Sequence, residues 1–172
     1  MMTTLPIPTV NGQETTPARL PLDAFRTVVE LTPLVSLDFV VRDPAGRVLL
    51  GYRRNRPAQG SWFVPGGRLG KNETRQEAFA RLTRLELGVE LDLGAARFIG
   101  VFEHLYADNF SGDPQFGTHY VVLAYMIEAN PAELRLPGDD QHSGYLWMST
   151  DEMLSRDDVH DYTKAYCASL HH

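Results

Sequence analysis

Hydrophobic and polar positions follow two different periods along this chain. Alternating and β-branched runs predict strands over residues 34–43, 48–54, 96–107, 118–129 and 145–148, and a short strand begins at residue 62. Helical spacing predicts helices over residues 22–32, 73–87, 150–155 and 160–170. Strands arranged around a central helix, with further helices near both ends, predict an α+β fold in which helices pack on a mixed sheet.

The first twenty residues differ from the rest of the chain. They are rich in Thr and Pro and show little periodicity, so we expect a flexible N-terminal arm over residues 1–20. Residues 21–172 then form a single domain, a size that suits one hydrophobic core. The polar stretch at residues 108–117 joins two long strands, and a loop of this length in a small domain is often functional.

Composition narrows the class of protein. Of the 172 residues 43% are hydrophobic, and the net charge of -6 argues against a nucleic-acid partner, which usually selects a basic face. No apolar run approaches the roughly 18 residues of a membrane span, and no secretory signal is evident. Cys167 is the only cysteine, so an intrachain disulfide is impossible and we expect a buried thiol in a cytoplasmic protein.

A glycine-rich turn followed by the central helix carries the strongest motif. Gly67, Glu73, Arg81, Glu86 and the Gly88-Val89 pair match the spacing G-x5-E-x7-R-E-U-x-E-E-x-G-U. This pattern resembles the signature of the Nudix hydrolase superfamily. The resemblance implies an α/β/α sandwich and divalent-metal chemistry on a nucleoside diphosphate derivative.

Three positions depart from that signature. Leu82 and Leu85 stand where the family has glutamates, and Thr83 stands at an apolar position. Magnesium prefers oxygen ligands, and each carboxylate helps to collect more metal. With Glu86 remaining, we expect about one Mg²⁺ per site, with Mn²⁺ an acceptable substitute. The alternative is that Ala78, Leu82 and Leu85 form a core stripe, an ordinary apolar helix face buried in the core of a degenerate, non-catalytic domain.

Other segments resemble a narrower group, the GDP-mannose mannosyl hydrolase subfamily. They are PLVSLDFVV, NRPAQGSWFVPGGR, ARLTRLELG, DNFSG, THYVVLAY and LPGDDQH, spread over about residues 23–168. The resemblance implies Mg²⁺-dependent hydrolysis of GDP-mannose, and more poorly of GDP-glucose, to GDP and free hexose. Water would attack the anomeric carbon through an oxocarbenium-like state, where the site must mainly stabilise departing GDP.

The same resemblance assigns roles to individual residues. Gly66, through its carbonyl, and Glu86 and Gln141 are the expected metal ligands, and His142 is the expected general base. The other expected site residues are Arg68, Arg81 and Tyr120 at the leaving diphosphate and Asp38 and Arg53 at the substrate. Arg81 can also brace the loop by pairing with Glu73, and Asp38 and Arg53 can equally form a cross-strand salt bridge.

Two further expectations concern ligands and partners. Phe25, Tyr52, Phe102 and Tyr106 offer aromatic surface for guanine without a basis for choosing among them. The subfamily resemblance implies a homodimer that binds a nucleotide sugar, with no nucleic acid and no membrane. The rival functions are a Nudix pyrophosphohydrolase that cuts between phosphates and a nucleotide-binding module without catalysis.

Overall fold

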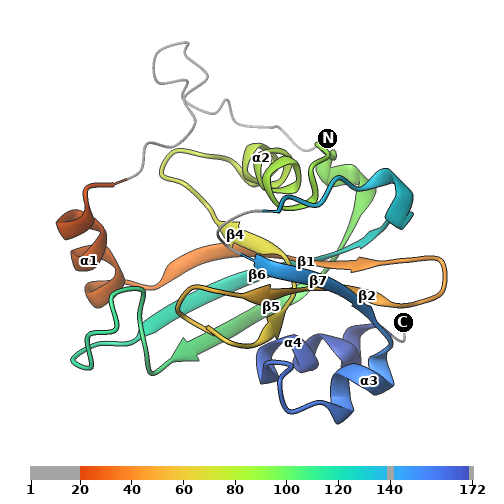
Figure 1. Ribbon diagram of the computed structural model, residues 1–172. Coiled ribbons are helices and arrows are strands. Elements are labelled where there is room, and N and C mark those ends of the chain that lie inside the picture. Colours follow the sequence, from red (N-terminus) through yellow and green to blue (C-terminus); the bar gives the residue numbers. More distant parts are fainter. Residues whose placement is uncertain (1–19, 139–141, 171–172) are drawn as a thin grey trace.

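A seven-stranded mixed sheet lies between layers of helices in the computed structural model, which describes residues 20–138 and 142–170 (Figure 1). The strands are β1 (Leu34–Arg42), β2 (Val48–Arg53), β3 (Trp62–Phe63), β4 (Gly66–Arg68), β5 (Ala96–Tyr106), β6 (Thr118–Glu128) and β7 (His142–Met148). The helices are α1 (Leu22–Leu31), α2 (Arg75–Leu87), α3 (Thr150–Ser155) and α4 (Asp161–Ala165), with 3-10 turns η1 (Leu93–Ala95), η2 (Pro131–Glu133) and η3 (Tyr166–Ser169). The predicted α+β class is confirmed.

The sheet is mixed because β1 and β6 run parallel, whereas the other strand pairs are antiparallel. The strand order is β3-β2-β1-β6-β5, with β4 paired to β1 and β7 paired to β2. The predicted hairpin of β1 and β2 is present, although these strands pair only where they leave the turn. Further along, β1 pairs with β4 in place of β2, and Asp38 of β1 lies opposite Gly66 of β4.

Helix α2 covers one face of the sheet, and α3 and α4 cover the other (Figure 1). Beneath α2, the helix side chains Ala78, Phe79 and Leu82 pack on apolar residues of β1 and β6. On the opposite face, the buried Tyr166 and Cys167 of the C-terminal segment pack against β1, β2 and β6. The predicted burial of the Cys167 thiol is confirmed. A pocket lined by residues of β1, β4 and β5 is the candidate functional site.

Helix α2 begins two residues later than predicted because Thr74 caps it. The Thr74 side chain accepts a hydrogen bond from the Glu77 amide, and the Glu77 carboxylate accepts one from the Thr74 backbone amide. This capping box satisfies amides that have no partner within the helix. Gly88 ends the helix with φ 68°, a left-handed conformation in which a Cβ is unfavourable.

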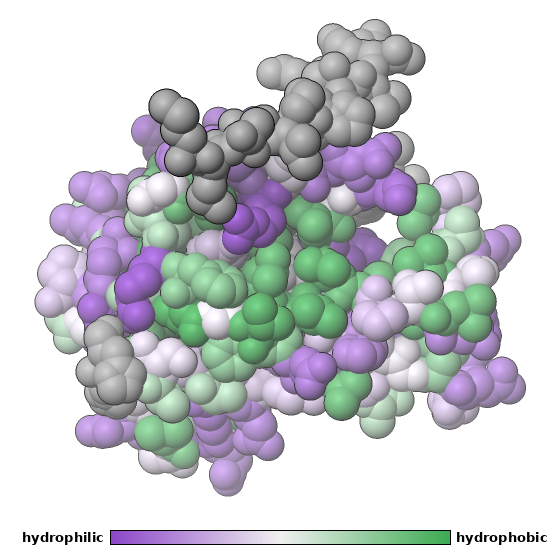
Figure 2. All heavy atoms as spheres, turned by 180° about the vertical axis from the view of Figure 1, so that it is seen from behind, coloured by the Kyte–Doolittle hydropathy of each residue, from purple (hydrophilic) through white to green (hydrophobic). Residues whose placement is uncertain are grey.

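Several large apolar side chains remain exposed on strand β5. Phe98, Val101 and Leu105 are 47%, 59% and 63% exposed. Hydrophobic residues also gather near the centre of the face in Figure 2. Among residues 20–138 and 142–170, no helix is long and apolar enough to cross a membrane. The predicted arm at residues 1–20 lies outside the described residues, apart from Leu20.

Candidate active site

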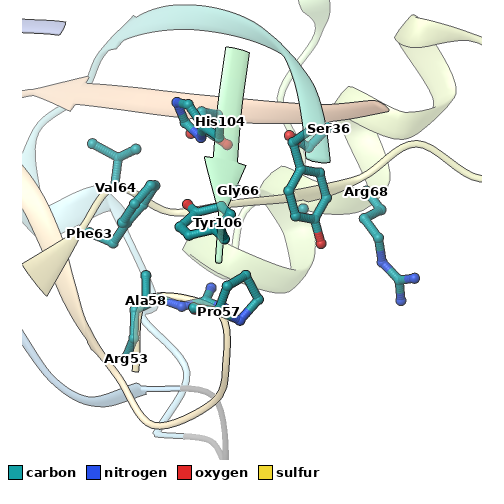
Figure 3. A pocket seen from close by; sticks show the side chains of 13 residues that line it. Ser36, Arg53, Pro57, Ala58, Phe63, Val64, Gly66, Arg68, His104 and Tyr106 are labelled. Carbon is teal, nitrogen blue, oxygen red and sulfur yellow. The ribbon is translucent and has the colours of Figure 1, made fainter. Parts of the chain in front are cut away.

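A pocket opens between β1, β4, β5, β6 and the loop that follows β2 (Figure 3). It is lined by Ser36, Asp38, Arg53, Pro57, Ala58, Phe63, Val64, Gly66, Gly67, Arg68, His104, Tyr106 and Tyr120. Five of the predicted site residues are therefore brought together: Asp38, Arg53, Gly66, Arg68 and Tyr120.

Asp38 supplies a buried carboxylate to this pocket. It lies in β1 opposite Gly66 of β4 and is only 6% exposed. Its Oδ2 accepts a hydrogen bond of 2.7 Å from the Tyr166 hydroxyl. Burial raises the pKa of the Asp38 carboxyl to about 7, although the Tyr166 hydrogen bond and the Arg53 charge act in the opposite direction. Asp38 is thus a polar group in an apolar wall with limited access to water.

Arg53 brings an incompletely paired cation to the same pocket. Its Nη2 donates to the Pro57 carbonyl at 3.4 Å, whereas its buried Nε–H has no hydrogen-bond partner within residues 20–138 and 142–170. Within the described residues, Arg53 and Asp38 form no ion pair, contrary to the cross-strand salt-bridge alternative, although their charges still interact. A buried donor without a partner is costly, so Arg53 is suited to an anionic ligand.

Arg68 and Tyr120 add further donors at the pocket. The Arg68 guanidinium lies 4.1 Å from the ring centroid of Phe25 in α1, which is a cation–π distance. The pocket view shows Arg53 and Arg68 on different sides of the opening (Figure 3). Burial raises the pKa of the Tyr120 phenol even though both arginine charges lower it, so the phenol stays protonated and can donate.

His104 and Tyr106 also line the pocket, although neither was among the predicted catalytic, substrate or metal residues. His104 is 3% exposed, and its Nε2 lies 3.3 Å from the Tyr166 hydroxyl. Its ring stacks on Tyr162 with centroids 4.2 Å apart. Burial, with a smaller contribution from the nearby His160, lowers the pKa of His104 to about 4. Residues 102, 104 and 106 alternate along β5, a signal that could have placed these rings on one face.

Glu73 and Arg81 brace the loop that leads into α2, as expected. Arg81 Nε donates to Glu73 Oε1 at 2.6 Å, and Glu73 Oε2 accepts from the Gly70 amide at 2.7 Å. Arg81 Nη2 donates to the carbonyl of Arg68 at 2.9 Å. Arg81 does not line the pocket, so its observed contacts act on the position of Arg68.

The two leucines of the motif occupy different environments. Leu82 is 4% exposed and contacts Gly67, where an added Cβ would lie 2.5 Å from Leu82 Cδ2. Leu85 is 52% exposed, so the alternative of a core stripe through Ala78, Leu82 and Leu85 is wrong at its last member. At the two positions where the signature has glutamates, Leu82 packs in the core, whereas Leu85 exposes an apolar side chain at the surface.

The potential metal ligands form a sparse set. Glu86 lies one helical turn after Leu82, on the buried side of α2, and is 6% exposed. A Cβ on Gly66 would collide with the Leu37 carbonyl, so only glycine lets β4 lie this close to β1. The Glu86 carboxylate and the Gly66 carbonyl are hard oxygen donors and suit Mg²⁺. Among the described residues, no three His, Cys, Asp or Glu side chains gather into a metal cluster.

Gln141 and His142 complete the predicted set. Gln141 lies outside the described residues. The backbone of His142 begins β7 and pairs with Arg53 of β2, so its position in the chain is beside one of the pocket cations. The roles predicted for both side chains remain predictions.

Comparisons with known proteins agree with this architecture. The sequence model of the NUDIX domain matches residues 32–168. The low-salt glycan biosynthesis protein Agl8 of Haloferax volcanii is 41% identical over 125 residues, which cover 73% of this chain and 76% of that protein.

Two solved structures have a similar fold. A MutT NUDIX hydrolase from Burkholderia pseudomallei is 26% identical with a TM-score of 0.65, over 80% of this chain and 98% of the other. The MutT protein of Methanosarcina mazei Go1 is 19% identical with a TM-score of 0.64, over 81% and 94%, and shows the shared fold alone. The fold implied by the loop–helix motif is confirmed, and the chain belongs to the Nudix family of hydrolases.

Proposed function

We propose that this Nudix hydrolase cleaves GDP-mannose, and GDP-glucose more slowly, into GDP and free hexose. Family membership supports hydrolysis of a nucleoside diphosphate derivative. The relative named for glycan biosynthesis supports a nucleotide sugar as that derivative. The choice of GDP-mannose, and of the sugar carbon as the point of attack, is the proposal.

The observation that carries the proposal is one pocket that combines cationic and phenolic donors with a buried carboxylate. The unpaired Nε–H of Arg53, together with Arg68 and Tyr120, suits the oxygens of a diphosphate. The buried Asp38 carboxylate suits the hydroxyl groups of a sugar, because a carboxylate accepts hydrogen bonds strongly. A nucleoside diphosphate sugar has both kinds of group next to each other.

Cleavage at carbon follows from which charges the site must stabilise. Water attacks the anomeric carbon, the bond from that carbon to the β-phosphate oxygen breaks, and the electron pair leaves with GDP. His142 takes the proton of the attacking water as general base. Arg53, Arg68 and Tyr120 donate to the oxygens of departing GDP, where negative charge increases.

Three residues would hold the divalent cation. They are Glu86 through its carboxylate, Gly66 through its carbonyl and Gln141 through its amide oxygen. When bound, the cation supplies positive charge that stabilises the leaving diphosphate. Arg81 supports Arg68 indirectly, because it holds the Arg68 carbonyl.

The second candidate is a pyrophosphohydrolase that attacks phosphorus. It is favoured by family membership alone, since attack at phosphorus is the usual reaction expected of the fold. Such chemistry is assisted by two metals that clamp the attacking and leaving oxygens. Leucine at positions 82 and 85 removes two carboxylates that would help to collect them.

The products separate the candidates. Incubation of the protein with GDP-mannose and Mg²⁺, followed by chromatography of nucleotides and sugars, is expected to give GDP and mannose. GMP with mannose 1-phosphate would establish the second candidate instead. Absence of turnover would favour a nucleotide-binding module.

A cytoplasmic homodimer is part of the same proposal. The exposed apolar side chains Phe98, Val101 and Leu105 on β5 support a contact surface for a second copy, because such surface is unfavourable in water. Light scattering is expected to give twice the mass of one chain, and a mass of one chain would remove the dimer.

A further inference from the structure

Tyr166 lies behind the pocket and outside the loop–helix motif. It belongs to the C-terminal turn η3 and is fully buried. Its ring meets Phe102 edge-on, with centroids 4.7 Å apart. These apolar contacts fix the ring, so the direction of its hydroxyl is also fixed.

The Tyr166 hydroxyl connects two polar groups of the pocket wall. It donates to Asp38 Oδ2 at 2.7 Å and lies 3.3 Å from His104 Nε2. A phenol has one proton to give, so it donates to Asp38 and can accept from Nε2–H of a neutral His104. Burial and the Asp38 charge hold the pKa of the Tyr166 phenol well above its ordinary value, so the donor proton is retained.

This arrangement leaves the second carboxylate oxygen of Asp38 for another partner. Asp38 Oδ1 lies on the side of Gly66, 2.9 Å from the place where a Cβ of that glycine would stand. The two carboxylate oxygens therefore face different partners: Oδ2 accepts the phenol hydrogen bond, and Oδ1 faces the part of the pocket wall that β4 forms. Without the phenol, the carboxylate could rotate about its χ2 angle.

We propose that Tyr166 is a positioning residue, which orients the Asp38 carboxylate so that Oδ1 accepts a hydroxyl group of the substrate sugar. The inference rests on the proposed function, since it assigns Asp38 to the sugar. It adds the C-terminal segment to the machinery of a site that sequence motifs place in β1, β4 and α2.

The test is a double-mutant cycle on the full chain. Steady-state kinetics with GDP-mannose and Mg²⁺ compare the wild type, Tyr166→Phe, Asp38→Asn and the double variant. Tyr166→Phe keeps the ring and is expected to lower kcat/KM by about 10- to 100-fold, the cost of a lost hydrogen bond to a charged group. In the Asp38→Asn background the same change is expected to alter kcat/KM by less than about twofold, because its target is already gone.

Tyr125→Phe is the matched control. Tyr125 is 2% exposed in the core beneath α2, and its hydroxyl accepts one hydrogen bond, from Arg75 Nη1 at 3.2 Å. Its loss is expected to lower the thermal midpoint about as much as Tyr166→Phe while kcat/KM stays within twofold. The control separates loss of a buried hydroxyl from loss of carboxylate orientation.

Two outcomes would overturn the inference. One is a Tyr166→Phe variant with kcat/KM within twofold of the wild type. The other is an equal effect of that change in both Asp38 backgrounds, which indicates a purely structural role. The wild-type products test the proposed function separately: GMP and mannose 1-phosphate would remove that function, while the wild type and the same three variants would still measure the Tyr166–Asp38 coupling on that reaction. If neither turnover nor calorimetric binding of GDP-mannose is observed, both fail.

Discussion

At the scale of single residues, Arg53 is the group most clearly prepared for a ligand. Among the residues that the structure describes, its buried Nε–H has no hydrogen-bond partner and the neighbouring Asp38 carboxylate does not pair with it. A phosphate oxygen would satisfy this donor. We expect its contribution to appear mainly in the transition state, as negative charge moves onto the leaving diphosphate.

Replacing Arg53 by methionine tests this assignment. The variant keeps an apolar stem but loses the cation, and kcat is expected to fall about 10²- to 10³-fold, as for other removed donors at a developing negative charge. Arg54→Met is the matched control, because Arg54 is the next residue and is exposed. Similar kinetics for both variants would show that Arg53 acts only through the general charge of the region.

The buried His104 makes a pH-dependent prediction. Its folded pKa of about 4 lies below the ordinary value, mainly through burial and secondarily through His160. Between pH 6.5 and 4, His104 is therefore protonated in the unfolded chain but stays neutral in the folded chain. The free energy of unfolding is expected to decrease as the pH falls from 6.5 toward 4, with the His104 contribution fully present above this window.

NMR titration of the imidazole measures this directly. The ring nitrogens of His104 are expected to show a neutral imidazole at pH 5.5, whereas a solvated histidine would be mostly charged. The His104→Gln variant is the control. The difference between its free energy of unfolding and that of the wild type is expected to change between pH 6.5 and 4. A midpoint near 6.5 would contradict the burial argument.

At the scale of elements, helix α2 combines a face that packs on the sheet with Glu86, the one glutamate that it keeps of the three in the second half of the signature. Leu82 packs on Gly67, Glu86 lies buried one turn later, and Leu85 is exposed. The same change from leucine to glutamate therefore has different consequences at the two positions. Substitution at these two positions therefore distinguishes the role of the motif in packing from its role in supplying carboxylates.

Leu82→Glu and Leu85→Glu form a matched pair. Leu82→Glu loses core packing and buries a carboxyl group, and it is expected to lower the free energy of unfolding by about 3–5 kcal/mol. Leu85→Glu places its carboxylate in water and is expected to stay within about 0.5 kcal/mol of the wild type. Urea denaturation measures both, and equal losses would contradict the environments described for the two leucines.

The helix also shows what the sequence can reveal about a site. Glu73 and Arg81 were predicted to brace the loop, and the hydrogen bonds from Arg81 in the helix to Glu73 in the loop before it confirm this prediction. The exposure of Leu85 was missed, since helical spacing alone does not say how wide the covered face is.

At the scale of the whole molecule, strand pairing rather than local pattern assembles the pocket. The strands and the α+β class were predictable from alternation and helical periodicity. The exchange of β2 for β4 alongside β1 was not, because it depends on pairings between distant segments. Tyr166 was missed for the same reason: 128 positions separate it from Asp38, and nothing in its local sequence marks it.

The central claim is that the bond from oxygen to the sugar carbon breaks, whereas bonds to phosphorus stay intact. The most direct measurement is hydrolysis of GDP-mannose with Mg²⁺ in H₂¹⁸O, followed by mass spectrometry of both products. The account predicts that the heavy oxygen enters mannose and that GDP remains unlabelled. Heavy oxygen in GDP, or in any phosphate-containing product, would contradict it.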